Sequence, residues 1–168
     1  MVAMLGSACG PYVGDRNFMT QDDDLDAAFR CAAQVGTGGS GAEQSLGAAI
    51  AALTPPLVDA GQCNADFLRQ DALLVLVILT DEDAEMDPLF AAQAIVDAKR
   101  GRFDDVVVVL LANTPEGDCP HGTGAKTAYG LSSFASAFQH AFVGPICAED
   151  YGDVFRDAVE HVSSACGG

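Results

Sequence analysis

The stretch Leu73-Leu-Val-Leu-Val-Ile-Leu79, followed directly by Thr80-Asp-Glu-Asp83, predicts the fold of this chain. The first part is an unbroken apolar run of strand length, rich in β-branched residues, and Val106–Leu111 is a second run of the same kind. Runs that do not alternate with polar residues are typical of strands that are buried on both faces, as in a parallel sheet. We therefore expect two parallel, fully buried strands here.

A helix is expected between these two strands. Asp87-Pro88 supplies an N-cap and a proline at the first helical position, and the basic residues Lys99 and Arg100 suit the helix end. The result is a βαβ unit. The pattern then repeats with a helix over Tyr129–Phe138 and a strand over Ala141–Ile146. A final helix begins near Asp150 and has one apolar face, formed by Tyr151, Val154, Phe155, Ala158, Val159 and Val162.

Two more helices are expected before the first strand. Ser40-Gly-Ala-Glu43 reads as a capping box, and Pro55-Pro56 ends the helix that it opens. The earlier helix has Thr20 as N-cap, and Val2–Leu5 forms a short edge strand. The buried positions of the two helices are Leu25, Ala28, Phe29 and Ala32 in the first, and Leu46, Ala49, Ile50 and Leu53 in the second. The sequence predicts one α/β domain over residues 1–168, a three-layer α/β/α Rossmann-like sandwich with a mainly parallel sheet.

The charge balance excludes some classes of partner. The chain has 24 acidic and 8 basic residues, a formal net charge of −16. Nucleic acids and anionic membrane surfaces are disfavoured, because both are bound mainly through Lys and Arg. Divalent cations and basic proteins remain compatible, as does the simpler interpretation that acidity maintains solubility. No stretch is long enough to span a bilayer.

The six cysteines point to an oxidising compartment. Their number is even, and they lack the CxxC or Cys/His spacing of zinc sites, so disulfides are expected, with 15 pairings open. The segment from Met1 to Cys9 has no basic region and too short an apolar stretch for an export signal. We therefore expect the natural N-terminus to lie upstream of Met1.

Carboxylates follow the first strand at the edge of the sheet where α/β proteins bind ligands. Asp81, Glu82 and Asp83 are hard oxygen ligands of the kind that Mg²⁺, Mn²⁺ or Ca²⁺ prefers. The alternative is that these acids solvate a loop and help to cap the next helix.

No motif argues for an enzyme. Gly36-x-Gly38-x-x-Gly41 follows a helix, whereas a dinucleotide site would follow a strand. Gly38-Gly-Ser-Gly41 does not fit a nucleophile elbow, because Ala42 stands where the second glycine of that motif belongs. Gly124-Ala-Lys-Thr127 does not fit a phosphate-binding loop, because it has no glycine beside the lysine. The three histidines, at positions 121, 140 and 161, are scattered and are expected in loops or on the surface.

Two segments together resemble the von Willebrand factor A (vWA) family, in its secreted, cysteine-containing bacterial form. They are Gly38-Gly-Ser-Gly-Ala-Glu-Gln-Ser-Leu46 and Leu76-Val-Ile-Leu-Thr-Asp-Glu-Asp83. Ser40 matches the family's threonine, Leu46 its leucine six residues later, and Thr80-Asp-Glu82 its strand-ending motif. The resemblance covers most of the chain, and it is least certain over residues 6–35 and 113–127.

The resemblance implies a metal-ion-dependent adhesion site completed by a partner's carboxylate. Carried over by position, Ser40 offers a hydroxyl and Asp81 a carboxylate to a Mg²⁺-type ion. Thr37 is a second hydroxyl candidate, and Asp83 a further carboxylate. The family's Asp-x-Ser-x-Ser motif is missing, so the metal site is expected to be partial or lost. The capping-box role of Ser40 then gains weight.

A missing first strand has a further consequence. In the family's strand order the Leu73–Leu79 strand lies beside it, so its edge is expected to be open and to favour homo-oligomers. We expect an extracytoplasmic protein-binding or adhesion module, without catalytic activity, built as an incomplete vWA domain. The alternatives are a metal-free structural or interaction domain of the same fold and, less favoured, an α/β hydrolase-type enzyme. Periplasmic, secreted and surface-lipoprotein locations all fit the parent protein.

Overall fold

The computed structural model describes residues 9–35, 43–117, 119–120 and 123–167. The chain divides into two compact units, one formed by Met1–Gly41 with Ala52–Leu68 and the other by Ala42–Ala51 with Arg69–Gly168. The expected edge strand at Val2–Leu5 and the capping box at Ser40 lie outside the described residues. That residues 1–168 form one domain stays a prediction.

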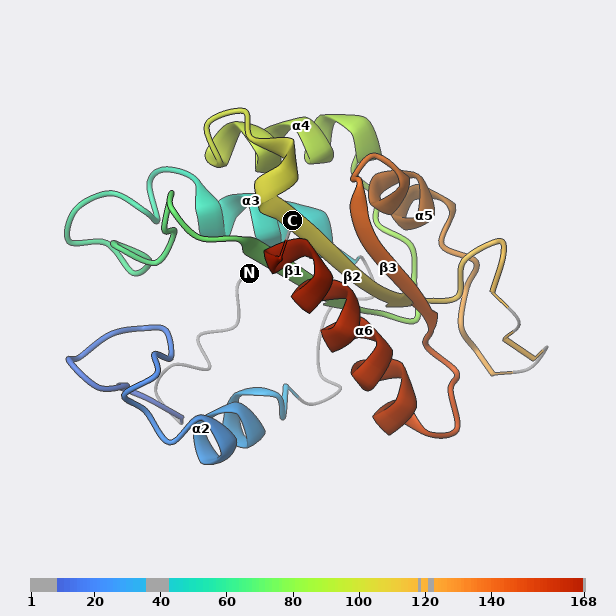
Figure 1. Ribbon diagram of the computed structural model, residues 1–168, viewed down its shortest axis with the longest axis horizontal. Coiled ribbons are helices and arrows are strands. Elements are labelled where there is room, and N and C mark those ends of the chain that lie inside the picture. The colour runs from blue at the N-terminus through green and yellow to red at the C-terminus, as the bar shows by residue number, and fades with distance from the viewer. Residues whose placement is uncertain (1–8, 36–42, 118, 121–122, 168) are drawn as a thin grey trace. The chain divides into compact units, whose positions relative to one another are not determined.

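The second unit contains a three-stranded parallel sheet of order β1-β2-β3 (Figure 1). This confirms the α/β class with an all-parallel sheet packed by helices, as in a Rossmann-like sandwich. In the register, Val77 of β1 lies beside Val109 of β2, which lies beside Phe142 of β3. The elements are β1 (Leu74–Leu79), α4 (Pro88–Ala98), a 3₁₀ turn (Phe103–Asp105), β2 (Val106–Ala112), α5 (Tyr129–Ser136), β3 (His140–Pro145) and α6 (Tyr151–Cys166).

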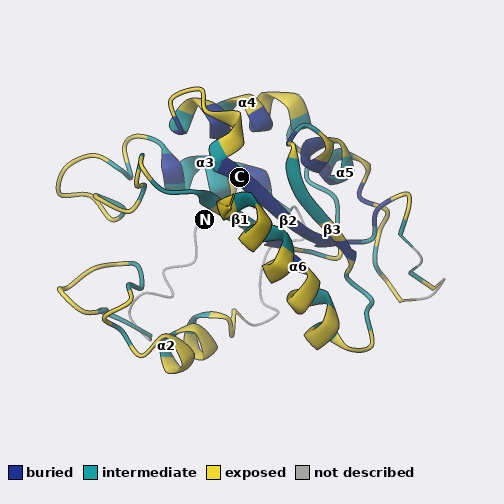
Figure 2. Cartoon of the chain, in the orientation of Figure 1, coloured by how far each residue is buried: buried dark blue, intermediate teal, exposed yellow. Residues whose placement is uncertain are grey.

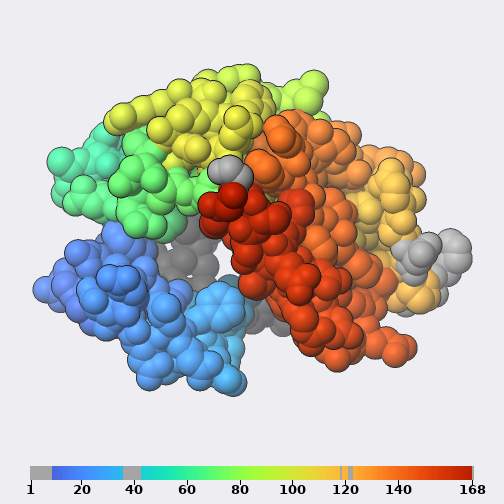
Figure 3. All heavy atoms as spheres, viewed as in Figure 1, coloured from blue at the N-terminus to red at the C-terminus, as the bar shows by residue number. Residues whose placement is uncertain are grey.

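Helices cover both faces of the sheet. α4 and α5 connect successive parallel strands, and right-handed crossovers in one direction place both helices on the same face. α6 crosses the opposite face (Figure 1), and at the surface it lies beside the segment of β3 and α5 (Figure 3). Gly144 of β3 makes close packing of α6 possible, because a Cβ at this position would lie 3.0 Å from Val154 and 2.9 Å from Leu111.

The two apolar runs differ in burial, and the prediction that both are fully buried is wrong for the first. Every residue of β2 is buried (Figure 2). β1 alternates instead: Val75, Val77 and Leu79 are 39%, 49% and 51% exposed. Among the described residues, β2 has a strand on each side, whereas β1 has one on a single side and α6 packs over β3 and β2. The core therefore centres on β2.

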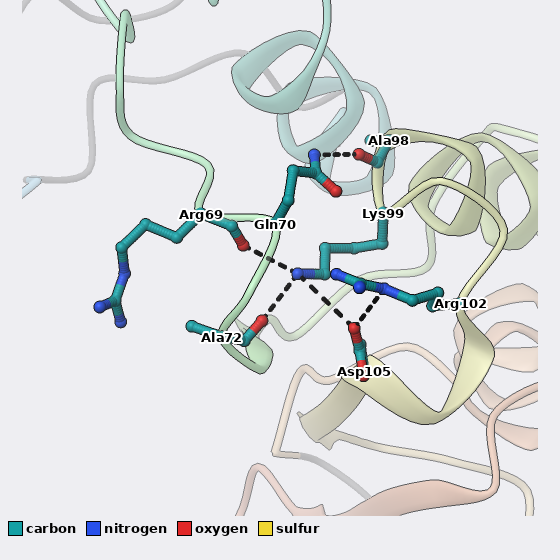
Figure 4. A network of polar contacts seen from close by, with 7 residues as sticks. All are labelled: Arg69, Gln70, Ala72, Ala98, Lys99, Arg102 and Asp105. Atoms are coloured by element: carbon teal, nitrogen blue, oxygen red, sulfur yellow. Dashed lines mark hydrogen bonds and ion pairs between the residues drawn. The ribbon is translucent and has the colours of Figure 1, made fainter.

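α4 begins as predicted and ends in an unexpected polar contact. Asp87 is its N-cap and accepts a hydrogen bond from the Phe90 N–H, with Pro88 at the first helical position. Lys99, the residue after the helix, is completely buried. Its ammonium donates to the carbonyl oxygens of Arg69 (2.8 Å) and Ala72 (2.7 Å), just before β1 (Figure 4).

The ammonium of Lys99 lies 4.0 Å from a carboxylate oxygen of Asp105, just before β2. Arg102 shares this carboxylate, and Gln70 donates to the Ala98 carbonyl. Burial lowers the pKa of Lys99, with the nearby Asp105 acting in the opposite direction. From the sequence, Lys99 is expected to stabilise the end of this helix through its charge alone. In the structure its main contacts join the segments that precede β1 and β2.

The end of α3 (Ser45–Leu53) agrees with the prediction, because the helix ends immediately before the Thr54-Pro55-Pro56 segment, with Leu46 and Leu53 buried. Its start does not agree: a capping box at Ser40 places Glu43 in the first helical turn, whereas Glu43 and Gln44 are not helical and the helix begins at Ser45. α5 and β3 differ from their predicted limits by one or two residues. In α6, Ala158 is buried but Phe155 and Val159 are 40% and 62% exposed, so only part of the predicted apolar face is covered.

The first unit is organised around a turn and one helix, α2 (Leu25–Ala32). Asp24, and not the predicted Thr20, is its N-cap. Thr20 instead donates to Asp23, which also accepts the Val13 N–H, and these backbone hydrogen bonds lower the pKa of Asp23. None of the α2 residues is buried, so the predicted buried stripe is wrong for this helix. A Cys9–Cys31 disulfide joins the helix to the preceding segment.

Candidate functional site at the carboxyl edge of the sheet

The loops that follow β1 and β2 meet at one edge, because the two strands are parallel and adjacent. β1 leads into Thr80–Asp83, and β2 leads into the long connection from Asn113 to α5. Crevices at the carboxyl ends of the strands are the usual ligand sites of open α/β sheets. The predicted acidic segment therefore lies in the expected place.

Thr80 sets the conformation of the acidic loop. Its N–H donates to Leu111 in β2, which continues the sheet by one residue beyond β1. Its hydroxyl accepts the Glu82 N–H (3.2 Å) and donates to the Glu82 carbonyl (3.1 Å). These local contacts turn the chain at Asp81, which is exposed.

Asp83 has a structural role. Its carboxylate accepts hydrogen bonds from the N–H groups of Gly130 (2.8 Å) and Leu131 (3.0 Å), and also from Ala84. It thereby satisfies the first N–H groups of α5, whose own N-cap residue Ala128 has no side chain that can do so. A Cβ at position 130 would lie 3.1 Å from the Asp83 carboxylate, so glycine is what permits this close approach.

Glu82 is paired with Lys126. The ammonium lies 2.9 Å from the Glu82 carboxylate, and the Lys126 side chain is 67% exposed. The hydrogen bond and charge of Glu82 raise the pKa of Lys126, and Asp81 adds a smaller contribution. The Lys126 N–H also donates to the Asp81 carbonyl (2.8 Å), so backbone and side chain both connect the two loops.

The connection from β2 to α5 is itself anchored. Asn113 donates to the Ala125 carbonyl and accepts the Ala128 N–H, which ties the loop to the end of β2. A disulfide joins Cys119 in this loop to Cys147, just after β3. The loop that positions Lys126 is therefore held to the ends of both β2 and β3.

Of the four predicted metal ligands, the structure places Asp81 and Asp83. Asp83 is committed to α5, whereas the Asp81 side chain makes no hydrogen bond or ion pair with another described residue. Ser40 and Thr37 lie outside the described residues. No three His, Cys, Asp or Glu side chains in the described part of the chain are grouped to hold a metal ion. Those residues do not by themselves make a metal site.

Three residues of this edge were not predicted from the sequence: Lys126, Asn113 and Gly130. In sequence, Gly124-Ala-Lys-Thr127 resembles only an incomplete phosphate-binding loop. The topology offered the better indication, because any segment between β2 and α5 has to pass the carboxyl edge. The histidines lie elsewhere: His140 begins β3, and the ring of His161 in α6 lies tilted beside that of Phe142, with 6.4 Å between the ring centroids. His121 is outside the described residues.

Comparison with known protein families, with characterised proteins and with solved structures finds no match for this chain. Of the helices in the described ranges, none combines the length and apolarity needed to cross a membrane. Cys63 and Cys166 are free and exposed, so four of the six cysteines form disulfides. The two disulfides fit an oxidising, extracytoplasmic environment.

Proposed function

We propose that this chain is an extracytoplasmic, non-catalytic binding module of the vWA type that recognises a protein partner at the carboxyl edge of its sheet. The observation that carries the proposal is the state of the acidic loop. Glu82 and Asp83 are used within the fold, while Asp81 is exposed and its side chain makes no hydrogen bond with another described residue. A fixed loop with one uncommitted carboxylate is suited to recognition.

The proposal includes a divalent cation of the Mg²⁺ kind, with Mn²⁺ and Ca²⁺ as related choices. Asp81 would be the ligand from the described part of the chain. The hydroxyls of Ser40 and Thr37 are the further candidates that the vWA resemblance offers. The cation would supply a positive charge between this acidic edge and a partner's carboxylate. Periplasmic, secreted and lipoprotein locations remain compatible with the module.

A metal-free interaction domain is the second candidate. The absence of a three-ligand group in the described residues favours it. In that case the Lys126–Glu82 pair and Asp81 would contact a partner directly, and cations would have no effect on binding.

Thermal unfolding in a Mg²⁺ and Mn²⁺ titration separates the candidates, with EDTA as the metal-free reference. A cation that binds only the folded state stabilises it by about 2.7 kcal/mol at a hundredfold excess over its Kd. We expect a rise in Tm for the parent chain that is lost in Asp81→Ala. Without metal, Asp81→Ala should change stability by less than about 0.5 kcal/mol, because the side chain is exposed.

Asp104→Ala is the matched control, since Asp104 is an exposed aspartate just before β2, at the opposite end of the sheet. It should keep the full cation response. An unchanged Tm in the parent chain at millimolar cation would favour the metal-free candidate. An equal response in parent and Asp81→Ala would place the cation elsewhere.

A further inference from the structure

The outer edge of β1 presents unpaired backbone groups in the described part of the chain. The Thr80 N–H points to Leu111 of β2, and the orientation of successive residues alternates along a strand. Val75, Val77 and Leu79 therefore direct both their N–H and C=O groups away from β2. No other described residue forms a backbone hydrogen bond with them.

The same three residues also carry the exposed apolar side chains of β1, at 39–51% exposure. β1 consists of Leu-Val-Leu-Val-Ile-Leu and has no charge, proline or glycine. Those are the features by which edge strands normally avoid pairing with other chains. The open edge and the open face therefore coincide at three residues.

The other edge of the sheet is protected. In β3 the Ile146 N–H points to Ala112 of β2, so Ala141, Val143 and Pro145 face outward. Pro145 has no N–H, and its carbonyl accepts the Ala148 N–H (3.4 Å). A strand added at β3 would lose a hydrogen bond at Pro145, whereas one added at β1 would lose none.

We propose that β1 pairs antiparallel with β1 of a second copy, about a two-fold axis at Val77. This register sets Val77 opposite Val77 and Val75 opposite Leu79, so every outward-facing residue meets another. The pairing makes about six hydrogen bonds between the copies. Opposite residues share one face, so each half-exposed side chain gains an apolar cross-strand neighbour.

A second copy fits this edge because an occupant has to be extended, apolar on both faces and uncharged over five residues. β1 itself meets each requirement, and the contact is self-complementary, as a two-fold dimer demands. The net charge of −16 on each chain opposes association, so dimerisation strengthens with salt. The pairing does not depend on the proposed function, and Asp81→Ala leaves it intact.

Sedimentation over a concentration series tests the dimer. Every variant carries Cys63→Ser and Cys166→Ser, so that the two exposed thiols cannot link copies. Val77→Lys brings two like charges together at the axis and raises the dimer Kd by about a hundredfold. Lysine is common on exposed edge strands, so the fold tolerates it. Val143→Lys, at a valine with 46% exposure on β3, leaves the Kd unchanged.

Amide hydrogen exchange tests the register without any substitution. The amides of Val75, Val77 and Leu79 become protected as concentration rises, while those of Leu76 and Ile78 are protected throughout. A monomer at high concentration and high salt overturns the proposal, as does a Val77→Lys variant that dimerises like the parent. Protection of all five amides in a monomer also overturns it, because the edge is then paired within one chain.

Discussion

The chain has two lysines, and they hold opposite ends of the same sheet in different ways. At the amino end, the Lys99 ammonium is buried and donates to two backbone carbonyls. At the carboxyl end, the Lys126 ammonium is 67% exposed and pairs with Glu82. The amino end is fixed by a buried side chain that bonds to the backbone, whereas the carboxyl end keeps exposed charges on a fixed loop. The buried ammonium thus lies at the end of the strands opposite to the one at which we propose recognition.

The largest effect is expected at the amino end. Lys99→Met keeps most of the side-chain volume but removes the donor from the part-buried carbonyls of Arg69 and Ala72. We expect a loss of about 2–4 kcal/mol in the free energy of unfolding, measured by urea denaturation. Arg69→Met is the control: Arg69 contributes its carbonyl, and its exposed side chain points away from the network (Figure 4). Equal stability of the two variants would contradict a structural role for Lys99.

A smaller effect is expected for Asp83 at the carboxyl end. Asp83→Ala removes the acceptor for the first N–H groups of α5, which should cost about 1–2 kcal/mol in unfolding free energy. Glu82→Ala, one residue away, breaks only the ion pair with the exposed Lys126 and should cost less than about 1 kcal/mol. Both values come from denaturant titrations. A greater loss in Glu82→Ala than in Asp83→Ala would reverse the roles assigned to the two acids.

The smallest effect is a difference in titration. Burial lowers the pKa of Lys99, and pairing with Glu82 raises that of Lys126. The contribution of Lys99 to the free energy of unfolding therefore increases with pH, up to the ordinary lysine pKa. The contribution of Lys126 is fully present below the ordinary pKa, and it is lost as the pH rises through the raised pKa of the folded state.

NMR titration of the two lysine side chains checks which of them has the lower pKa, and Lys126→Arg assigns the signals. Lys99 should lose its proton at lower pH than Lys126. The same order of deprotonation in urea-unfolded chain would show that the fold does not cause the difference.

The parallel sheet and its helices were predictable because apolar runs and helix caps are local in sequence. Asp87-Pro88 and Pro55-Pro56 mark helix ends through their own covalent properties. The exposure of β1 was not predictable from its residues, since β1 and β2 are equally apolar. They differ in how many described strands flank them and in the packing of α6, and both are properties of the whole sheet.

The candidate site was predictable only in position. Asp81 at the end of an unbroken apolar run indicated the carboxyl edge, but three consecutive acids look alike in sequence. Their separate roles depend on Lys126 and Gly130, which are more than 40 residues away along the chain. Lys99 shows the same limit, because its partners Arg69 and Ala72 come from the segment before β1.

The Cys119–Cys147 disulfide has a mechanical consequence. It closes a covalent ring with a sequence separation of 28 that contains both α5 and β3. If the chain is pulled from its two ends, force bypasses this ring. About 95 Å of contour length, at roughly 3.4 Å per residue, stays unavailable for extension. Under tension the loop that bears Lys126 would keep its covalent anchor beside β3 even after the strands had separated.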